Sequence, residues 1–207
     1  MNREDKFAHK AKEYEALQRR LDTANAIALK IKENIALTKE IHIIDFGSGT
    51  GLLLEALSND IGKVTAIDIS PSMTNVLREK NLPCEVDINE IDLTKEDLDI
   101  QVDGIVTSMT MHHIKDIKTM FTKFSKMLKN GGFIAIADLD KEDGSFHSVD
   151  TGVEHFGFER NEFIYFAQES GFTECKIVDV VKIVKQNRDY GIFLMTGVKA
   201  NFSESEV

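Results

Sequence analysis

Three glycines at two-residue spacing follow a short apolar run near the middle of the first hundred residues. The segment reads Asp45-Phe46-Gly47-Ser48-Gly49-Thr50-Gly51. Glycines at the point where a strand meets a helix allow a tight turn, and they let a ligand approach the backbone because no Cβ stands in the way. A second acid, Asp68, ends the next apolar run, at the distance where a carboxylate can accept both ribose hydroxyls of a nucleoside. Loop and acid together predict a nucleoside site.

The spacing of the glycines bears on which nucleoside ligand would bind. The dinucleotide fingerprint GxGxxG needs a glycine at position 52, and this chain has Leu52 there. This difference argues against a nicotinamide-dependent oxidoreductase, although that class also binds a nucleoside with a glycine loop and a downstream acid. The remaining alternative is that the glycines only form a turn and Asp68 only ends a strand, and the joint presence of the loop and both acids disfavours it.

Four histidines fall in the segments that follow two predicted strands. His112 and His113 come after the fourth strand, and His147 and His155 lie in a long polar segment after the fifth. A histidine can take a proton from a reacting group near neutral pH. Each of the four is therefore a candidate catalytic base, although a loop histidine can also serve only as a hydrogen-bonding or surface residue.

The polar segment after the fifth strand also contains carboxylates. The possible metal ligands are Asp138, Asp140, Glu142, Asp143, His147 and His155. Their spacing lacks the fixed local pattern of a metal motif, so we predict solvated loop charge and no metal site. Structureless loops as long as residues 138–158 tend to be functional, and we expect this one to act as a substrate lid.

The elements that must position these residues alternate along the chain. Strands are expected at 41–46, 64–69, 102–108 and 133–137, with a weaker strand ending near Ile91 and Asp92. Helical spacing of apolar residues separates them, and two last strands, 175–184 and 191–198, are close enough to form an antiparallel hairpin. The pattern predicts an α/β fold: a doubly wound, Rossmann-like sheet of seven strands, mostly parallel, that binds ligands at the carboxyl ends of its strands.

Local signals set several helix boundaries. Asp22 or Thr23 is expected to cap a helix whose apolar positions run from 24 to 35, and Ser70 to cap one that starts at Pro71. Thr94 and Asp97 have capping-box spacing. A helix carrying Ile117, Phe121, Phe124 and Leu128 is expected to be closed by Asn130 and Gly131. Further helical turns are expected upstream, at Phe7, Ala11, Tyr14 and Leu17.

Four segments together resemble the class I S-adenosylmethionine-dependent methyltransferases, in particular the small-molecule group that includes the ubiquinone and menaquinone C-methyltransferases. The segments are residues 44–51, 66–73, 102–106 and 128–132, and the resemblance covers about residues 41–199. It implies that the cofactor is S-adenosyl-L-methionine. Carried over position by position, it implies a cofactor-binding set of Asp45, Gly47, Ser48, Gly49, Gly51, Asp68, Ile69, Met73, Asp92, Leu93 and Ser108.

The resemblance also divides this set among the parts of the cofactor. Asp45, Gly47 and Gly49 would hold the methionine moiety and Asp68 the ribose. Asp92 with Leu93 would bracket the adenine, in preference to Asp87 with Ile88, because the distance to the fourth strand is more usual. Arg19 or Arg20 could pair with the cofactor carboxylate, although a solvated helix face is the preferred interpretation of these arginines.

Methyl transfer is an in-line displacement, so the protein must position the acceptor and exclude water, and no metal is required. An acceptor that loses a proton also needs a base, for which His113, His147 and His155 are candidates beside His112. Ser108-Met109-Thr110-Met111 stands where methyltransferases of nucleobases and glutamine resemble one another in an Asn/Asp-Pro-Pro-aromatic signature. The lack of that signature, together with the acidic net charge, argues against a modifier of nucleic-acid bases and does not identify the acceptor. The leading hypothesis is methyl transfer to an O, N or C atom of a small molecule. A non-catalytic cofactor-binding or interaction protein stays open as the alternative.

Composition agrees with these expectations. The chain has 207 residues, 25 basic and 35 acidic, with a net charge of −10, which disfavours nucleic acid and anionic lipid as partners. No apolar run approaches the 20 or so residues of a membrane span, and the N-terminus has no apolar signal region, so we predict no membrane association and a cytoplasmic protein. We expect one domain, 1–207, with a helical cap over 1–40, a core over 41–199 and a polar tail over 200–207. The oligomeric state stays open.

Overall fold

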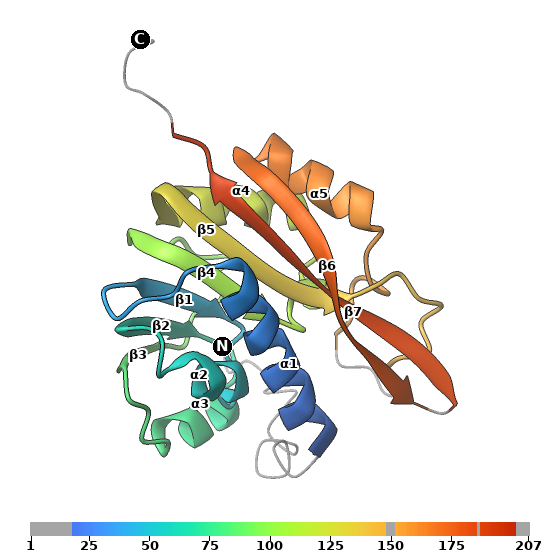
Figure 1. Ribbon diagram of the computed structural model, residues 1–207, viewed down its shortest axis with the longest axis horizontal. Helices are drawn as coiled ribbons and strands as arrows, with labels where there is room; N and C mark the ends of the chain where they lie inside the picture. The colour runs from blue at the N-terminus through green and yellow to red at the C-terminus, as the bar shows by residue number, and fades with distance from the viewer. Residues whose placement is uncertain (1–17, 148–151, 186, 202–207) are drawn as a thin grey trace.

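The computed structural model describes residues 18–147, 152–185 and 187–201 (Figure 1). Seven strands form one sheet in the order β3-β2-β1-β4-β5-β7-β6, which confirms the predicted mostly parallel sheet with a C-terminal hairpin. The strands are β1 (His42–Phe46), β2 (Lys63–Ile67), β3 (Glu85–Asn89), β4 (Val102–Ser108), β5 (Leu128–Leu139), β6 (Phe172–Lys185) and β7 (Arg188–Lys199). The helices are α1 (Gln18–Asn34), α2 (Leu52–Leu57), α3 (Pro71–Arg78), α4 (Ile117–Met127), α5 (Arg160–Glu169) and the short 3-10 helix η2 (Met111–His113).

The chain reverses its path across the sheet at β1. From β1 it proceeds outward through β2 to β3, and it then returns to pair β4 in parallel with the other side of β1. In a doubly wound sheet this switch point opens a crevice beyond the carboxyl ends of the central strands. The segments that follow β1 and β4 are therefore held at the mouth of the crevice.

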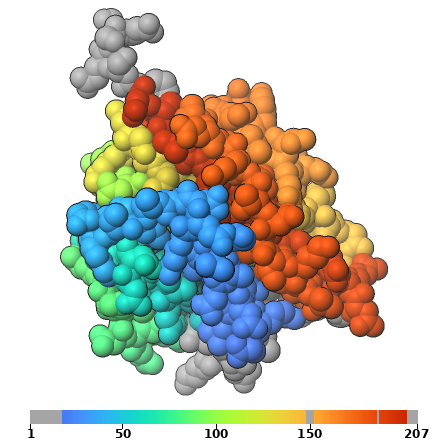
Figure 2. All heavy atoms as spheres, in the orientation of Figure 1, coloured from blue at the N-terminus to red at the C-terminus, as the bar shows by residue number. Residues whose placement is uncertain are grey.

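Two helical layers cover the sheet, because neighbouring residues of a strand point to opposite faces. Ile43 packs among α1, α2 and α3, and Ile44 packs on the other face among α4 and α5. Figure 1 shows the first group of helices in front of the sheet and the second behind it. Figure 2 shows α1 lying between the α2 side of the molecule and the β6–β7 hairpin.

Helix α1 belongs to the packed core. Ile27 and Ile31 are fully buried in one cluster with Leu54 of α2 and Ile192 of β7. The predicted N-cap was wrong, since Asp22 and Thr23 lie inside the helix, where the Thr23 hydroxyl donates to the Arg19 carbonyl at 2.8 Å. The helical turns predicted at Phe7, Ala11, Tyr14 and Leu17 lie outside the described residues. No helix in the described part of the chain has the length and apolar content to cross a bilayer.

The third strand ends earlier than predicted, at Asn89 instead of near Ile91. The capping-box prediction was also wrong, because residues 93–95 form a turn instead of a helix. The carboxylate of Asp92 accepts the Thr94 amide at 3.1 Å and so supplies the local hydrogen bond that stops the chain from continuing as a strand.

The boundary between α4 and β5 also differs from the prediction. α4 ends at Met127, and Leu128 begins β5 opposite Val102 of β4, so Asn130 and Gly131 lie within the strand and do not close a helix. The pairing of β5 with β4 is interrupted between Val102 and Gly104, and Gly131 has a φ of 74°. A bulge of this kind adds chain without changing the pairing further along.

Candidate functional site

The loop after β1 needs glycine for two different reasons. Gly47 has a φ of 72°, and a Cβ built on it would lie 2.2 Å from the Thr110 hydroxyl, so only glycine fits between the loop and the segment after β4. Gly49 has a φ of 53°, and a Cβ on it would meet nothing within 4 Å. The loop is held in place by the amides of Gly47 and Ser48, which both donate to the Ile67 carbonyl, at 2.8 and 3.1 Å. The backbone near Gly49 therefore faces open space that a ligand can use.

Asp45 is the second-to-last residue of β1 and is buried next to this loop. Its side chain is only 2% exposed, and its Oδ2 has no hydrogen-bond partner among the described residues. Burial, and secondly the negative charge of Asp68, raise the pKa of Asp45 to about 8. The buried hydroxyls of Ser48 and Thr50 also have no partner in the part of the chain that is described. Unpaired buried polar groups are costly, so these three side chains, at the end of β1 and in the loop after it, have donors and acceptors that a polar ligand could satisfy.

Asp68 fixes the loop from the other side. Its two carboxylate oxygens accept the amides of Gly49 and Ser70, each at 2.8 Å, and so connect the glycine loop to the start of α3. Ser70 caps α3 as predicted, and its hydroxyl accepts the Met73 amide. The carboxylate therefore has a fixed position at the carboxyl end of β2, where it lines the second cavity.

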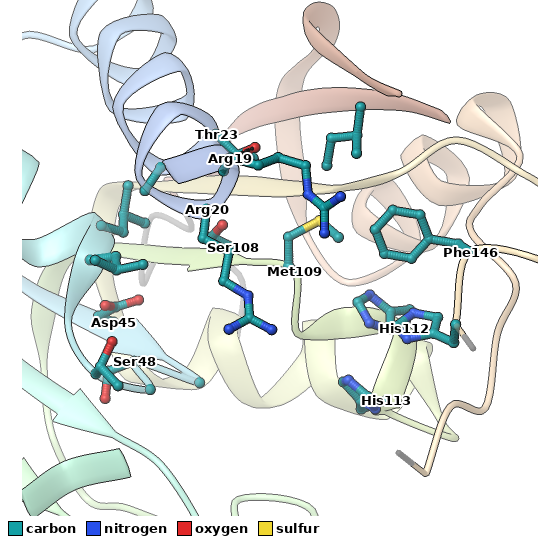
Figure 3. Close-up of a pocket in the computed structure, with 18 of the residues that line it drawn as sticks. Arg19, Arg20, Thr23, Asp45, Ser48, Ser108, Met109, His112, His113 and Phe146 are labelled. Atoms are coloured by element: carbon teal, nitrogen blue, oxygen red, sulfur yellow. Dashed lines mark hydrogen bonds between the residues drawn. The ribbon is translucent and has the colours of Figure 1, made fainter. Parts of the chain in front are cut away.

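Two cavities meet at the loop. The first, of about 400 Å³, lies on the side of α1 (Figure 3), and the second, of about 280 Å³, lies on the side of α3. They share Gly47, Gly49, Ser108, Met109 and His113. The site residues predicted from the sequence divide between them: Asp45 and Ser48 line the first, and Asp68, Ile69, Met73, Asp92 and Leu93 line the second.

Two predicted or weighed positions lie outside both cavities. Gly51 is the N-cap of α2 with a φ of 83°, and a Cβ there would lie 2.4 Å from Leu77, so its requirement for glycine comes from packing. Asp87 lies within the edge strand β3 and pairs with Lys63 at 2.7 Å. Of the two acid positions weighed near the third strand, only Asp92 reaches the second cavity.

A buried histidine and carboxylate pair with each other beyond the end of β4 and near the end of β5, and the histidine lines the first cavity. The His112 Nδ1 lies 2.7 Å from Asp138 Oδ1, and the two side chains are 1% and 0% exposed. The backbone amides of His112 and Leu139 donate to the same carboxylate, at 3.2 and 2.7 Å. The carboxylate favours the imidazole tautomer with its proton on Nδ1. In this tautomer the lone pair lies on Nε2, where a base needs it.

Two more histidines gather around His112. The ring centroid of His112 lies 4.3 Å from that of His113 and 5.0 Å from that of His147. Burial, and then the charges of His112 and His113, lower the pKa of His147 to about 4, and its Nε2 is buried with no hydrogen-bond partner among the described residues. His155 does not join them. Its Nε2 lies 2.9 Å from the Ile114 carbonyl, and it lines a separate depression on the side of α4.

The segment after β5 is fastened to the tip of the β6–β7 hairpin. Ser145 bonds Tyr190 at 2.7 Å, and Arg188 pairs with Asp143 at 2.5 Å. The Lys185 ammonium donates to the Phe146 carbonyl and lies 5.2 Å from its ring. These contacts place Phe146 and His147 on the wall of the first cavity. No group of three histidine, cysteine, aspartate or glutamate side chains in the described ranges has an arrangement that could hold a metal ion.

The pairing of His112 with Asp138 is the feature of the site that the sequence reasoning did not find. The sequence predicts Asp138 only as solvated loop charge or as one of several possible metal ligands, whereas the residue lies in β5 and is fully buried. The available signal was positional: each residue follows one of two apolar runs, 102–108 and 133–137, and parallel neighbours bring their carboxyl ends together.

The sheet order, the glycine loop after β1 and the acid after β2 define the fold of the class I S-adenosylmethionine-dependent methyltransferases. A family profile described as a methyltransferase domain matches residues 44–134. Residues 44–134 therefore carry a methyltransferase domain, and the cofactor of this class is S-adenosylmethionine.

Individual proteins show the same likeness. An uncharacterized methyltransferase of Schizosaccharomyces pombe is 33% identical over 159 residues, which cover 68% of this chain and 51% of that protein. A ubiquinone biosynthesis O-methyltransferase of Xanthomonas campestris is 28% identical over 158 residues, which cover 73% of this chain and 66% of that protein. The chain thus spans half to two thirds of the length of these relatives. The structure of a DhpI–SAH complex matches with a TM-score of 0.75 and 19% identity, covering 95% of this chain and 94% of that one.

Proposed function

We propose that the protein transfers the methyl group of S-adenosylmethionine to a hydroxyl oxygen of a small molecule. The observation that carries the proposal is the meeting of two cavities at Gly47, Gly49 and Ser108. One cavity presents a nucleoside-sized surface with a fixed acid, and the other presents His112, whose Nδ1 is paired with Asp138. A methyl donor and a proton acceptor would thus meet at one point.

The unpaired polar atoms of the glycine loop fit the amino-acid end of this cofactor. Asp45 would accept the α-ammonium group, which satisfies its orphaned Oδ2 and favours its charged form. The Ser48 and Thr50 hydroxyls would donate hydrogen bonds to the carboxylate of the cofactor. When bound, the cofactor supplies the methyl group, which it carries on a sulfonium. The open space at Gly49 leaves room for the cofactor beside the backbone.

The second cavity fits the nucleoside end. Asp68 would accept the ribose hydroxyls, because it lines this cavity and its two backbone amides hold the carboxylate in place. Asp92 and Leu93 would bracket the adenine, and Ile69 and Met73 would supply apolar contact. This assignment retains the position that the sequence favoured for adenine.

The His112–Asp138 pair would act on the acceptor. Nε2 of His112 takes the proton from the acceptor hydroxyl as the methyl group is transferred, and the Asp138 carboxylate stabilises the imidazolium that forms. Phe146 and His147 help to exclude water from the reacting atoms. The relative from Xanthomonas is an O-methyltransferase, which supports oxygen over carbon or nitrogen as the acceptor atom. The net charge of −10 supports a small molecule over nucleic acid.

Two measurements test the proposal. Calorimetry should show that S-adenosylhomocysteine binds and that NAD does not bind comparably. Incubation with methyl-labelled cofactor and a fractionated metabolite extract should then produce a labelled small molecule. Binding of S-adenosylhomocysteine without transfer to any fraction would instead favour the non-catalytic alternative, and preferential binding of NAD would contradict the assignment of the loop.

A further inference from the structure

Met109 follows the last residue of β4 and has a left-handed backbone, with a φ of 56°. In this region the Cβ of an L-residue comes too close to the following carbonyl oxygen, so the conformation is strained in methionine. Two other described residues besides glycines share it: Glu174 at a bulge in β6 and Asn187 in the turn before β7. Of these three, only Met109 lines the cavities at the glycine loop. A strained backbone at a ligand site indicates a function for the side chain that it carries.

Contacts on both sides of this turn hold the chain in place. The Met109 amide donates to the Ala137 carbonyl at 2.9 Å, which extends the pairing of β4 with β5 by one step. Thr110 then lies against Gly47, and its hydroxyl donates to the Ser108 carbonyl at 3.1 Å. The position of the Met109 side chain is therefore set by β5 on one side and by the glycine loop on the other.

The Met109 side chain lies where the two cavities meet. Among the residues that line both cavities, it has the one long apolar side chain, since the others are two glycines, a serine and a histidine. In the view of Figure 3 it stands between Ser108 and Phe146. The side chain also packs against the core cluster that contains α1 and α2. A thioether is flexible and polarisable, so it can adapt to the surface of a ligand at this point.

Met109 is also the most accessible methionine in the described part of the chain. It is half-buried, whereas the other five described methionines are at most 4% exposed. These are Met73, Met111, Met120, Met127 and Met195. Met109 thus keeps apolar surface open to the cavities, and a ligand that covers this surface removes it from water.

We infer that Met109 is a positioning residue, whose left-handed backbone holds its thioether beside the transferring methyl group, between the cofactor sulfur and the acceptor. This inference rests on the proposed methyl transfer and adds the residue that shapes its path. In-line transfer needs the sulfur, the methyl carbon and the acceptor atom on one line. An apolar wall at this point limits the directions from which the acceptor can approach, and it keeps water from the sulfonium.

The first experiment places Met109 relative to the ligand without turnover. Dilute hydrogen peroxide converts accessible methionine into its sulfoxide, and mass spectrometry follows the oxidation of each methionine. Met109 should oxidise faster than the five buried methionines, and saturation with S-adenosylhomocysteine should slow its oxidation several-fold. If calorimetry shows that the ligand binds and the oxidation rate of Met109 is unchanged, the inference is overturned and the cofactor assignment stands. If the ligand does not bind, both fail.

Three substitutions separate the backbone of Met109 from its side chain. Met109→Ala and Met109→Gly both remove the thioether, and only the second relieves the left-handed backbone. Met109→Gly should therefore melt about 2–8 °C above Met109→Ala. On the labelled fraction of the metabolite extract, both should lower kcat about ten- to hundredfold with a smaller change in KM. Met109→Leu should restore most of the lost kcat, because leucine is apolar and similar in volume.

Glu174 is the matched control, because it has a similar φ of 52°, is exposed on β6 and lines neither cavity. Glu174→Gly should likewise melt above Glu174→Ala, and both should leave kcat unchanged. If kcat follows stability, so that Met109→Gly is as active as the unaltered protein, Met109 serves only the fold and the inference is wrong. It is equally wrong if Met109→Leu loses as much kcat as Met109→Ala.

Discussion

At the scale of single residues, Asp45 combines complete burial with a carboxylate oxygen that has no hydrogen-bond partner in the described structure. A pKa of about 8 keeps most of this group neutral at pH 7 without a ligand. A ligand ammonium group beside it would favour the charged form. Binding and deprotonation of Asp45 should therefore be linked.

Binding of S-adenosylhomocysteine at pH 7 should release close to one proton, on the order of the protonated fraction of Asp45. Calorimetry in buffers with different ionisation enthalpies measures this release. Asp45→Asn should abolish the release and weaken binding. Identical apparent heats in every buffer would show that Asp45 is already charged before the ligand binds.

The stability of the ligand-free protein provides a second test of the same group. The folded-state pKa of Asp45 is raised, so its favourable contribution to stability is complete below its unfolded pKa near 3.8 and is lost as the pH rises through about 8. Asp45→Asn should consequently raise the melting temperature at pH 8 to 9, and this gain should shrink toward pH 4. A constant difference across that range would contradict the raised pKa.

The His112–Asp138 pair predicts a division of effects among the histidines. His112→Asn should lower kcat by about 10² to 10⁴ while cofactor affinity stays unchanged, because it removes the base and no cofactor contact. Asp138→Asn should also lower kcat, since it no longer favours the proton on Nδ1.

His155→Gln is the matched comparison, because His155 bonds the Ile114 carbonyl outside the first cavity. It should retain most of the activity. If His155→Gln loses as much as His112→Asn, or if His112→Asn retains full activity, proton removal by His112 is wrong. The enzyme would then act through proximity and desolvation alone.

At the scale of elements, the central strands could be predicted because they are buried on both faces and form continuous apolar runs. Residues 102–108 show this, with both boundaries of β4 as expected. The end of the edge strand β3 was harder to predict, because its residues are partly or fully exposed. The apolar Ile91 and Leu93 that follow it resemble a continuation of the strand, so its end was predicted too late in the chain. Composition and periodicity therefore identify the layers of the fold better than its edges.

The functional pairs depend on which strands become neighbours, and a single sequence does not show that directly. Asp68 and Gly49 are 19 residues apart, and a known loop pattern brought them together in the prediction. His112 and Asp138 are 26 residues apart without such a pattern. Their contact follows from the parallel pairing of β4 with β5, so it emerges only when the sheet order is known.

The glycine loop provides a test at this scale, because Gly47 is needed for close packing and Gly49 leaves space for a ligand. Gly47→Ala should lower the melting temperature strongly, since its Cβ would meet the Thr110 side chain and the residue also keeps a left-handed φ. Gly49→Ala has open space, so its cost in stability should be limited to the left-handed backbone, about 1–2 kcal/mol, while its methyl group enters the ligand space. Thermal unfolding and calorimetry on both variants should show the larger loss of stability for Gly47→Ala and the larger loss of affinity relative to stability for Gly49→Ala. The opposite order would contradict this division.

At the scale of the whole molecule, α1 connects the site to the core. One end of the helix carries Arg19 and Arg20 toward the first cavity, and its middle carries Ile27 and Ile31 into the core cluster. The predicted boundary at residue 41 therefore divides residues that pack together. The same helix is expected to serve ligand binding through its first turn and stability through its later turns.

Two truncations separate these roles of α1. Removal of residues 1–20 deletes both arginines and leaves every buried isoleucine of the helix, so the protein should fold with a similar melting temperature and lose affinity for the acceptor and the cofactor. Removal of residues 1–34 also deletes Ile27 and Ile31, and each fully buried isoleucine contributes about 1.5–3 kcal/mol. Their loss exposes Leu54 and Ile192 as well, and the total approaches the 5–15 kcal/mol, roughly, by which such domains are stable. Circular dichroism should therefore show a cooperative unfolding transition for the first truncation and none for the second, and a stable core in the second would mean that α1 packs on a domain already complete from residue 41.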